Sequence, residues 1–163
     1  MEDKFLKKYE SGAEIVVATV EHAIELAPKL REFDMLECTA MGISPLSALV
    51  LGIEESDQVY TILSPEGEAI GIFGSGVNPM FPYVWLLGSD GIRERAYEFI
   101  KDSPRIAQEL VRPYGYAKNY VYAEYKDSIR WLEWMGATFD YEKVYFDEHP
   151  FYEFKITYKG DNQ

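Results

Sequence analysis

The chain has 163 residues, 47% of them hydrophobic, and carries a formal net charge of −12. This length suits one domain, and the hydrophobic content argues against intrinsic disorder. The acidic balance argues against nucleic-acid binding, which depends on neutralising phosphates with Lys and Arg. The single cysteine, Cys38, excludes an internal disulfide framework and a cysteine zinc site.

The ends of the chain and its apolar runs set further expectations. Met1 to Lys8 are charged and lack an apolar core, so we expect no signal peptide. No apolar run approaches the ~20 residues that cross a bilayer, so we expect no membrane partner. These features predict an acidic protein of a reducing compartment, with residues 1–13 as an N-terminal tail, residues 14–159 as one domain and residues 160–163 as a C-terminal tail.

The first third of the chain predicts one strand followed by helices. A strand at Glu14–Val20 leads into one or two helices over Glu21–Glu37, interrupted near Pro28. Pro45 suits the first turn of a further helix, which the apolar run LSALVLGI continues.

The middle of the chain predicts a hairpin. The strands Val59–Leu63 and Ala69–Phe73 flank SPEGE, whose Pro, Glu and Gly are typical turn residues. The glycine cluster Gly71–Gly76 comes next, and Pro79 and Pro82 follow it closely. We therefore expect a flexible loop or bulge at this cluster.

A strand and a long helix are predicted after this loop. The strand is Pro82–Leu87, and Ser89 or Asp90 then provides the N-cap of a helix from about Gly91. We expect an interruption of this helix near Pro104 and an end before the next proline.

The segment Asn119–Phe139 predicts a strand, a short helix and a glycine stop. Asn119–Tyr125 is rich in β-branched and aromatic residues, which favours a half-buried strand. Asp127 and Ser128 offer side-chain oxygens to the free N–H groups of a helix that ends at Gly136.

The C-terminal strands complete the predicted fold. Thr138–Phe146 and Phe151–Tyr158 form a final hairpin around DEHP. The element order is then β-α-α-β-β-β-α-β-α-β-β, an α/β (α+β) fold with a mixed, mostly antiparallel sheet. This order resembles the GCN5-related N-acetyltransferase (GNAT) fold, an acyl-CoA N-acyltransferase-like fold.

Three local strings carry a closer resemblance: TAMGISPLSAL, PYVWLLGSDGI and NYVYAEYKDSIRWLEWMGATF. Together they resemble the GNAT-like proteins of short-tailed bacteriophages, the family labelled internal virion protein A or phage acetyltransferase. The resemblance implies a role in virion assembly, a protein partner from the phage or the host, and a location in the host cytoplasm and the virion.

The resemblance also implies acetyl-CoA as cofactor, with its pyrophosphate held by the loop that follows the Pro82–Leu87 strand. Backbone N–H groups and a helix N-terminus hold the anion in that fold. The corresponding residues here are Leu86, Leu87, Gly88, Ser89, Asp90, Gly91, Ile92 and Arg93. The loop lacks a basic residue at its start, and an acidic cap at Asp90 would repel the phosphates, which Arg93 would partly offset. We therefore expect acetyl-CoA binding to be weak or lost, and an ordinary N-cap is the alternative role of Ser89 or Asp90.

The catalytic positions of the family also differ in this chain. Active GNAT enzymes commonly carry an Asn at the start of the last helix and a Tyr about seven residues later, and this Tyr is often the general acid that protonates the departing thiolate. In register with Gly136, these places hold Tyr125 and Leu132, and leucine cannot donate a proton. The remaining candidates are Glu124 as general base and Tyr125 or Tyr122 as acid. A surface carboxylate and packed strand tyrosines are the alternatives.

Metal binding is not predicted, because the two histidines lack the sequence spacing of metal ligands and the DEH segment fits a hairpin turn.

Two functions remain. The first is a phage GNAT-fold protein that has lost catalysis and acts through protein contacts, and the second is an acetyl-CoA-dependent N-acetyltransferase of a phage or host amine. An open cleft between splayed strands would favour the transferase, whereas a cleft filled by aromatic side chains would favour the first function. The acceptor, the protein partner, the stage of infection and the oligomeric state stay open.

Overall fold

The computed structural model describes residues 3–160, which form one mixed sheet flanked by helices. The strand order is β1-β2-β3-β4-β5-β6-β8-β7. The strands are β1 (Lys7–Lys8), β2 (Glu14–Val17), β3 (Gln58–Leu63), β4 (Ala69–Val77), β5 (Pro82–Gly88), β6 (Tyr116–Tyr122), β7 (Thr138–Phe146) and β8 (His149–Thr157). The helices are α1 (Val20–Leu26), the 3₁₀ turn η1 (Ala27–Lys29), α2 (Glu32–Ala40), α3 (Pro45–Glu55), α4 (Gly91–Arg95), α5 (Tyr97–Val111) and α6 (Lys126–Trp134).

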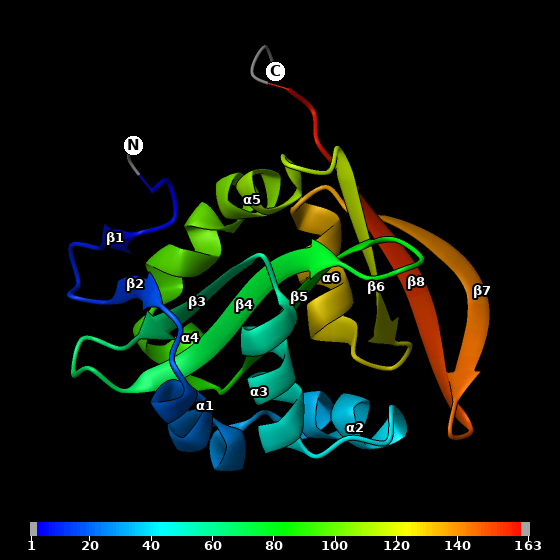
Figure 1. The fold of residues 1–163 in the computed structure, drawn as a ribbon, viewed down its shortest axis with the longest axis horizontal. Helices are drawn as coiled ribbons and strands as arrows, with labels where there is room; N and C mark the ends of the chain where they lie inside the picture. Colours follow the sequence, from blue (N-terminus) through cyan, green and yellow to red (C-terminus); the bar gives the residue numbers. More distant parts are fainter. Residues whose placement is uncertain (1–2, 161–163) are drawn as a thin grey trace.

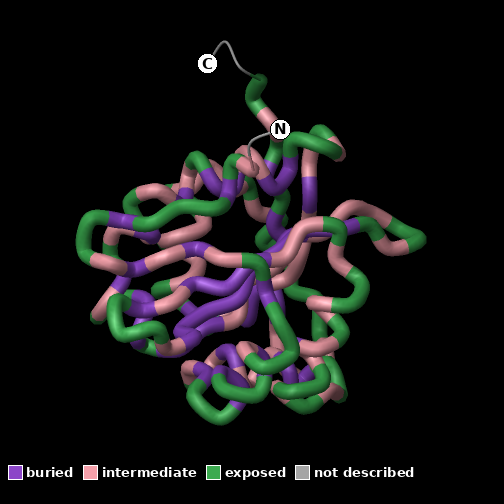
Figure 2. Tube along the Cα trace, turned by 60° about the vertical axis from the view of Figure 1, so that its left-hand side comes forward, coloured by how far each residue is buried: buried purple, intermediate pink, exposed green. Residues whose placement is uncertain are grey.

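The helices cover both faces of the sheet. Figure 1 shows α1, α2 and α3 along one side of the strands and α5 along the other. One core cluster, which includes Leu26 and Leu49, packs α1 and α3 against Ile72 of β4. A larger cluster packs α5 and α6 against the opposite face, where Phe99 and Trp131 meet edge to face. Figure 2 shows that the buried residues are concentrated in the central strands. The predicted α+β class with a mostly antiparallel sheet is therefore confirmed.

Both predicted hairpins are present. β3 and β4 pair antiparallel around the SPEGE turn, and β7 and β8 pair around a two-residue turn at Asp147 and Glu148. These two residues have φ angles of 48° and 65°, the left-handed conformations of a type I′ turn. That turn matches the twist of the flanking strands, so the DEH segment is a hairpin turn.

The prediction of a flexible loop at Gly71–Gly76 is wrong, because β4 continues through this cluster to Val77. The glycines allow close packing instead. A Cβ atom on Gly76 would lie 2.6 Å from the Tyr83 hydroxyl, and one on Gly74 would lie 2.4 Å from the Gln58 carbonyl oxygen. Small residues are thus required where the neighbouring strands approach β4.

The helix expected from Gly91 is broken, but not at Pro104. α4 ends at Arg95, because its C-cap Ala96 has a φ of −142°, which is not helical, and α5 then runs through Pro104. Proline cannot donate a hydrogen bond to the carbonyl four residues earlier. The Ser103 hydroxyl donates to that carbonyl, on Ile100, at 2.6 Å, which explains why the helix continues.

The segment expected as an N-terminal tail packs on the sheet over its described residues, 3–13. Phe5 stacks on Tyr60 with ring centroids 4.7 Å apart, and both rings lie in the core. The Tyr9 hydroxyl donates to Asp102 of α5 at 2.8 Å. The two-residue strand β1 adds an antiparallel edge that the sequence did not predict.

The strand expected at Asn119–Tyr125 lies earlier in the chain, because β6 starts at Tyr116 and ends at Tyr122. The following helix, α6, has Tyr125 at its N-cap and no side-chain capping hydrogen bond. The expected capping by Asp127 or Ser128 is therefore wrong.

No single helix within residues 3–160 is long and apolar enough to cross a membrane. The bent pair α2 and α3 has the necessary length and apolar composition only when the two helices are taken together.

We predict that Gly52→Ala destabilises the protein. A Cβ atom at this position of α3 would lie 2.5 Å from the Trp85 ring, so the ring must move. Overpacking of this kind costs about 1–3 kcal/mol, whereas glycine to alanine in an unobstructed helix is stabilising. Chemical denaturation would measure the change, with Ser47→Ala on the exposed side of the same helix as control. Unchanged or increased stability of Gly52→Ala would contradict the close contact.

Candidate functional site

Among the strands of residues 3–160, β5 and β6 form the only parallel pair, and this pair separates along its length. One register pair, Tyr83 with Lys118, joins the two strands. The Asn119 side chain then bridges the widening gap, donating from Nδ2 to the Val84 carbonyl oxygen at 2.7 Å and accepting the Tyr120 N–H at 2.8 Å. Beyond this bridge the strands diverge toward their C-terminal ends. We call this gap the splay.

The splay leaves one peptide group of β5 without a partner. Peptide groups alternate in direction along a strand. Those of Val84 and Gly88 point away from β4, because the Val84 carbonyl contacts β6 and the Gly88 N–H and carbonyl contact α2. The Leu86 peptide group lies between them and points the same way. Within residues 3–160 we find no hydrogen-bond partner for it, so its N–H is a free donor in the splay.

A cleft of 390 Å³ opens at the splay. This volume lies within the range of small-molecule sites, roughly 300–1,000 Å³. Its lining comes from both faces of the sheet and is mostly aromatic and aliphatic. The side from α2 and α3 contributes residues that include Arg31, Asp34, Glu37, Cys38, Met41 and Leu51, and the side from α5 and α6 contributes residues that include Phe99, Ile106, Leu110, Ser128, Trp131 and Leu132.

Helix α2 supplies the polar side of the cleft. Asp34, which is only 1% exposed, forms a bidentate pair with Arg31, with oxygen-to-nitrogen distances of 3.0–3.3 Å. The same carboxylate accepts the Gly88 N–H at 2.8 Å. The Arg31 N–H donates to the Gly88 carbonyl oxygen at 2.9 Å, so the start of α2 is bound to the end of β5.

Glu37 lies one turn further along α2 and faces the splay. Its Oε2 accepts the Tyr122 N–H of β6 at 2.8 Å, and the side chain lines the cleft. Burial raises the pKa of Glu37 to about 8, an effect that the Tyr122 hydrogen bond only partly opposes. A carboxyl group with a pKa close to the working pH is suited to proton transfer.

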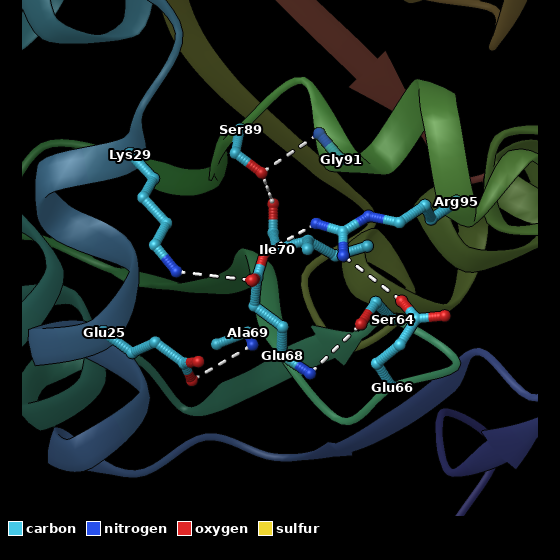
Figure 3. Close-up of polar contacts among 10 residues, drawn as sticks. All are labelled: Glu25, Lys29, Ser64, Glu66, Glu68, Ala69, Ile70, Ser89, Gly91 and Arg95. Atoms are coloured by element: carbon cyan, nitrogen blue, oxygen red, sulfur yellow. Dashed lines mark hydrogen bonds and ion pairs between the residues drawn. The ribbon is translucent and has the colours of Figure 1, made fainter.

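The loop after β5 is held by hydrogen bonds to β4, to α2 and within the loop. Figure 3 shows the Ser89 hydroxyl donating to the Ile70 carbonyl oxygen and accepting the Gly91 N–H, each at 3.1 Å. The Ser89 N–H also donates to the Ile70 carbonyl at 2.9 Å, and the Ile92 N–H donates to the Ser89 carbonyl at 3.3 Å. With the Gly88 N–H bound to Asp34, four N–H groups of this loop are already used.

The charged residues of the loop do not behave as the sequence suggested. Asp90 occupies the N-cap of α4 but makes no side-chain capping bond, so the carboxylate that competes for a loop N–H is that of Asp34. Arg93 points outward, its side chain 74% exposed and 3.8 Å from Asp127. Figure 3 shows Arg95 held by Glu66 and Glu68 on the β3–β4 turn.

The proposed base and acid lie outside the cleft lining. Glu124 is exposed and accepts the Tyr122 hydroxyl at 2.5 Å. Tyr125 is buried, with Phe33 at a ring-centroid distance of 4.9 Å and the Arg31 guanidinium 5.4 Å from its ring. Its hydroxyl makes no hydrogen bond, and burial next to the Asp34 carboxylate raises its pKa. Leu132, which stands where the family commonly has its general-acid tyrosine, does line the cleft.

Sequence reasoning missed Asp34 and Glu37, the two carboxyl groups that matter most here. Spaced three residues apart, they look like the solvent face of a helix. Their partners, Gly88 and Tyr122, are 54 and 85 residues away in the chain. The helix also runs to Ala40, beyond the predicted end at Glu37. Only a prediction of which face of α2 meets the splay would have identified them.

Comparison with known proteins rests on structure, because no protein-family model matches this chain and no curated protein matches it. A probable GNAT-family acetyltransferase from Chromobacterium violaceum aligns with a TM-score of 0.62 and 15% identity over 96% of this chain and 93% of its own. A GNAT-family acetyltransferase from Bacillus anthracis aligns with a TM-score of 0.60 and 10% identity over 96% and 99%. The chain has the GNAT acetyltransferase fold.

A third structure of this fold, the ribosomal-protein-S18-alanine N-acetyltransferase from Escherichia coli, aligns with a TM-score of 0.56 and 12% identity over 93% of this chain and 98% of its own. At these identities the likeness concerns the GNAT fold alone. Among residues 3–160, no group of three or more His, Cys, Asp or Glu side chains could hold a metal ion.

We predict that Glu37→Gln stabilises the protein at alkaline pH. The folded protein holds the Glu37 proton more tightly than the unfolded chain, so this residue favours the native state at low pH. That contribution is lost as the pH rises from 4.5, the ordinary pKa, to about 8. Glutamine is neutral throughout and still accepts the Tyr122 N–H. The variant should gain roughly 2–4 kcal/mol over the wild type above this range and nothing below it.

Denaturant unfolding across the pH range would measure this difference, with Glu124→Gln as the control at an exposed site. A constant difference between Glu37→Gln and the wild type at every pH would contradict the raised pKa.

Proposed function

We propose that this is a bacteriophage GNAT-fold protein that has lost acetyl-CoA-dependent catalysis and acts through binding, in virion assembly or as a minor virion component. One observation carries the loss of the cofactor: the buried Asp34 carboxylate occupies the Gly88 N–H at the loop where this fold places a pyrophosphate. The phage setting rests on the sequence resemblance of the three strings described above.

Energetics support the loss of cofactor binding. A hydrogen bond to a charged group contributes about 1.5–3 kcal/mol. An anion that must displace Asp34 would therefore bind with an affinity lower by roughly 10- to 150-fold. Displacement would also place a carboxylate beside the phosphates, although Asp34 would keep its pair with Arg31. The N–H groups of Ser89, Gly91 and Ile92 are held by the Ile70 carbonyl, the Ser89 hydroxyl and the Ser89 carbonyl. The basic Arg95 is already paired with Glu66 and Glu68.

Exposed aromatic side chains support a role in protein contacts. Trp134 at the end of α6 is 57% exposed, and Tyr141 and Tyr145 on the outer strand β7 are 59% and 62% exposed. Tyrosine and tryptophan are enriched at interfaces, where they bury large areas at little conformational cost. The two tyrosines lie on the sheet edge farthest from the N-terminal strands.

Calorimetric titration with acetyl-CoA tests the proposal. We expect no micromolar binding to the wild type at moderate salt. Asp34→Ala frees the Gly88 N–H and leaves Arg31 unpaired next to the phosphate position, so affinity should increase at least about tenfold. Asp90→Ala is the matched control, because it removes an exposed carboxylate of the same loop that contacts no N–H group; we expect a change below about threefold.

Circular dichroism would confirm that Asp34→Ala folds, and Ser89→Ala, which frees the Gly91 N–H, provides a second test at lower cost to stability. Micromolar binding to the wild type, or a larger gain from Asp90→Ala than from Asp34→Ala, would overturn the proposal.

A second candidate function is acetyl transfer to an amine, and the open cleft favours it. Glu37 could accept the proton of an attacking amine, and the free Leu86 N–H could stabilise the oxyanion that develops on the thioester carbonyl. A proton donor for the departing thiolate is the missing element, since Leu132 holds that place.

This candidate predicts acetyl-CoA turnover with amine acceptors that rises with pH toward about 8, the pKa of Glu37. Glu37→Gln should then reduce the rate at least about 100-fold, whereas Glu124→Gln should not. A thiol-release assay with a set of polyamines and peptides would measure both. Absence of turnover at every pH would exclude this candidate.

A further inference from the structure

The part of the cleft between the sheet and α5 and α6 offers mostly apolar surface. Its walls are aromatic and aliphatic side chains, namely Phe73, Phe99, Ile106, Ala107, Leu110 and Trp131. Of the two polar side chains that α5 and α6 contribute, Ser103 is already engaged, because it accepts the Trp131 indole N–H at 2.8 Å and donates to the Ile100 carbonyl. The other, Ser128, lies on the first turns of α6. A ligand group against these aromatic and aliphatic walls gains from burying hydrocarbon and finds no hydrogen bond there.

Hydrogen-bonding groups are available where the cleft passes through the splay. Glu37 uses Oε2 for the Tyr122 N–H, and its other oxygen makes no hydrogen bond to the described residues. The Leu86 peptide group is also free. Arg31 is the one cationic side chain among the described residues that line the cleft, and it is committed to Asp34, so it does not receive an anionic head group.

The charge state of Glu37 favours an uncharged head group. With a pKa of about 8 its carboxyl group is mostly protonated at neutral pH, so it can both donate and accept a hydrogen bond. A head group that also donates and accepts, such as a primary amide or an alcohol, matches it and the Leu86 peptide group together.

We propose that the cleft is a binding site for a medium-chain aliphatic molecule with an uncharged amide or alcohol head group, the chain lying between the sheet and α5 and the head group in the splay between Glu37 and Leu86. This site goes beyond the proposed function and does not need acetyl-CoA. The ligands of this site carry no phosphate. An experiment can therefore contradict this site without contradicting the proposed loss of acetyl-CoA binding, and the reverse.

Calorimetry with four soluble probes tests the proposal on the wild-type protein. We expect octanamide to bind at least about tenfold more tightly than butanamide, because four more methylene groups are buried. It should also bind at least about tenfold more tightly than octanoate, whose charge finds no free cation. Octylamine binding more tightly than octanamide would overturn the uncharged head group.

Two variants that fill the cleft locate the site. Ala107→Phe on α5 and Leu132→Trp on the more exposed α6 each reduce the space for the chain, and either should lower octanamide affinity about tenfold or more. Leu132→Trp keeps the test available if Ala107→Phe does not fold. Val144→Phe, which enlarges an exposed side chain of β7, is the matched control. Unchanged affinity in a folded variant that fills the cleft would overturn the proposal.

Discussion

The separation of β5 from β6 is the constraint on which the rest of the site depends. Parallel strands that diverge leave backbone N–H and C=O groups without ladder partners, and buried groups of this kind must be satisfied elsewhere. Three side chains do this here: Asn119 bridges the strands, Asp34 accepts from Gly88 and Glu37 accepts from Tyr122. The gap would otherwise expose several unpaired peptide groups in the middle of the sheet.

The side chains that satisfy the backbone groups of the gap also affect the loop after β5. The carboxylate that satisfies Gly88 also fixes α2 against the loop after β5, and Ser89 fixes that loop to β4. Four N–H groups of this loop are thus engaged, and an N–H group that already has a partner is not available to an anion. The cleft itself stays open and mostly apolar, so the fold retains space for a ligand, whereas we propose that the phosphate position is closed. This combination is why binding, and not acetyl transfer, is the function that we favour.

The sequence predicted the features that depend on local chemistry. The SPEGE and DEH turns, the proline at the start of α3 and the GNAT element order all follow from turn residues and periodicity. The sequence-based predictions were wrong where contacts with residues far along the chain determine the local structure. Pro104 stays helical because Ser103 replaces the missing donor, and the Gly71–Gly76 strand persists because its neighbours require small residues. Asp34 and Glu37 act through partners far along the chain, which no local pattern shows.

The closed phosphate loop is the central claim, and amide NMR spectra recorded during titration with inorganic pyrophosphate and then with acetyl-CoA test it most directly. The account predicts that the N–H resonances of Gly88, Ser89 and Gly91 keep their positions, because their hydrogen bonds to Asp34, Ile70 and Ser89 persist. Saturable shifts of these three resonances with either anion would contradict it, since they would show that the loop opens to receive a pyrophosphate.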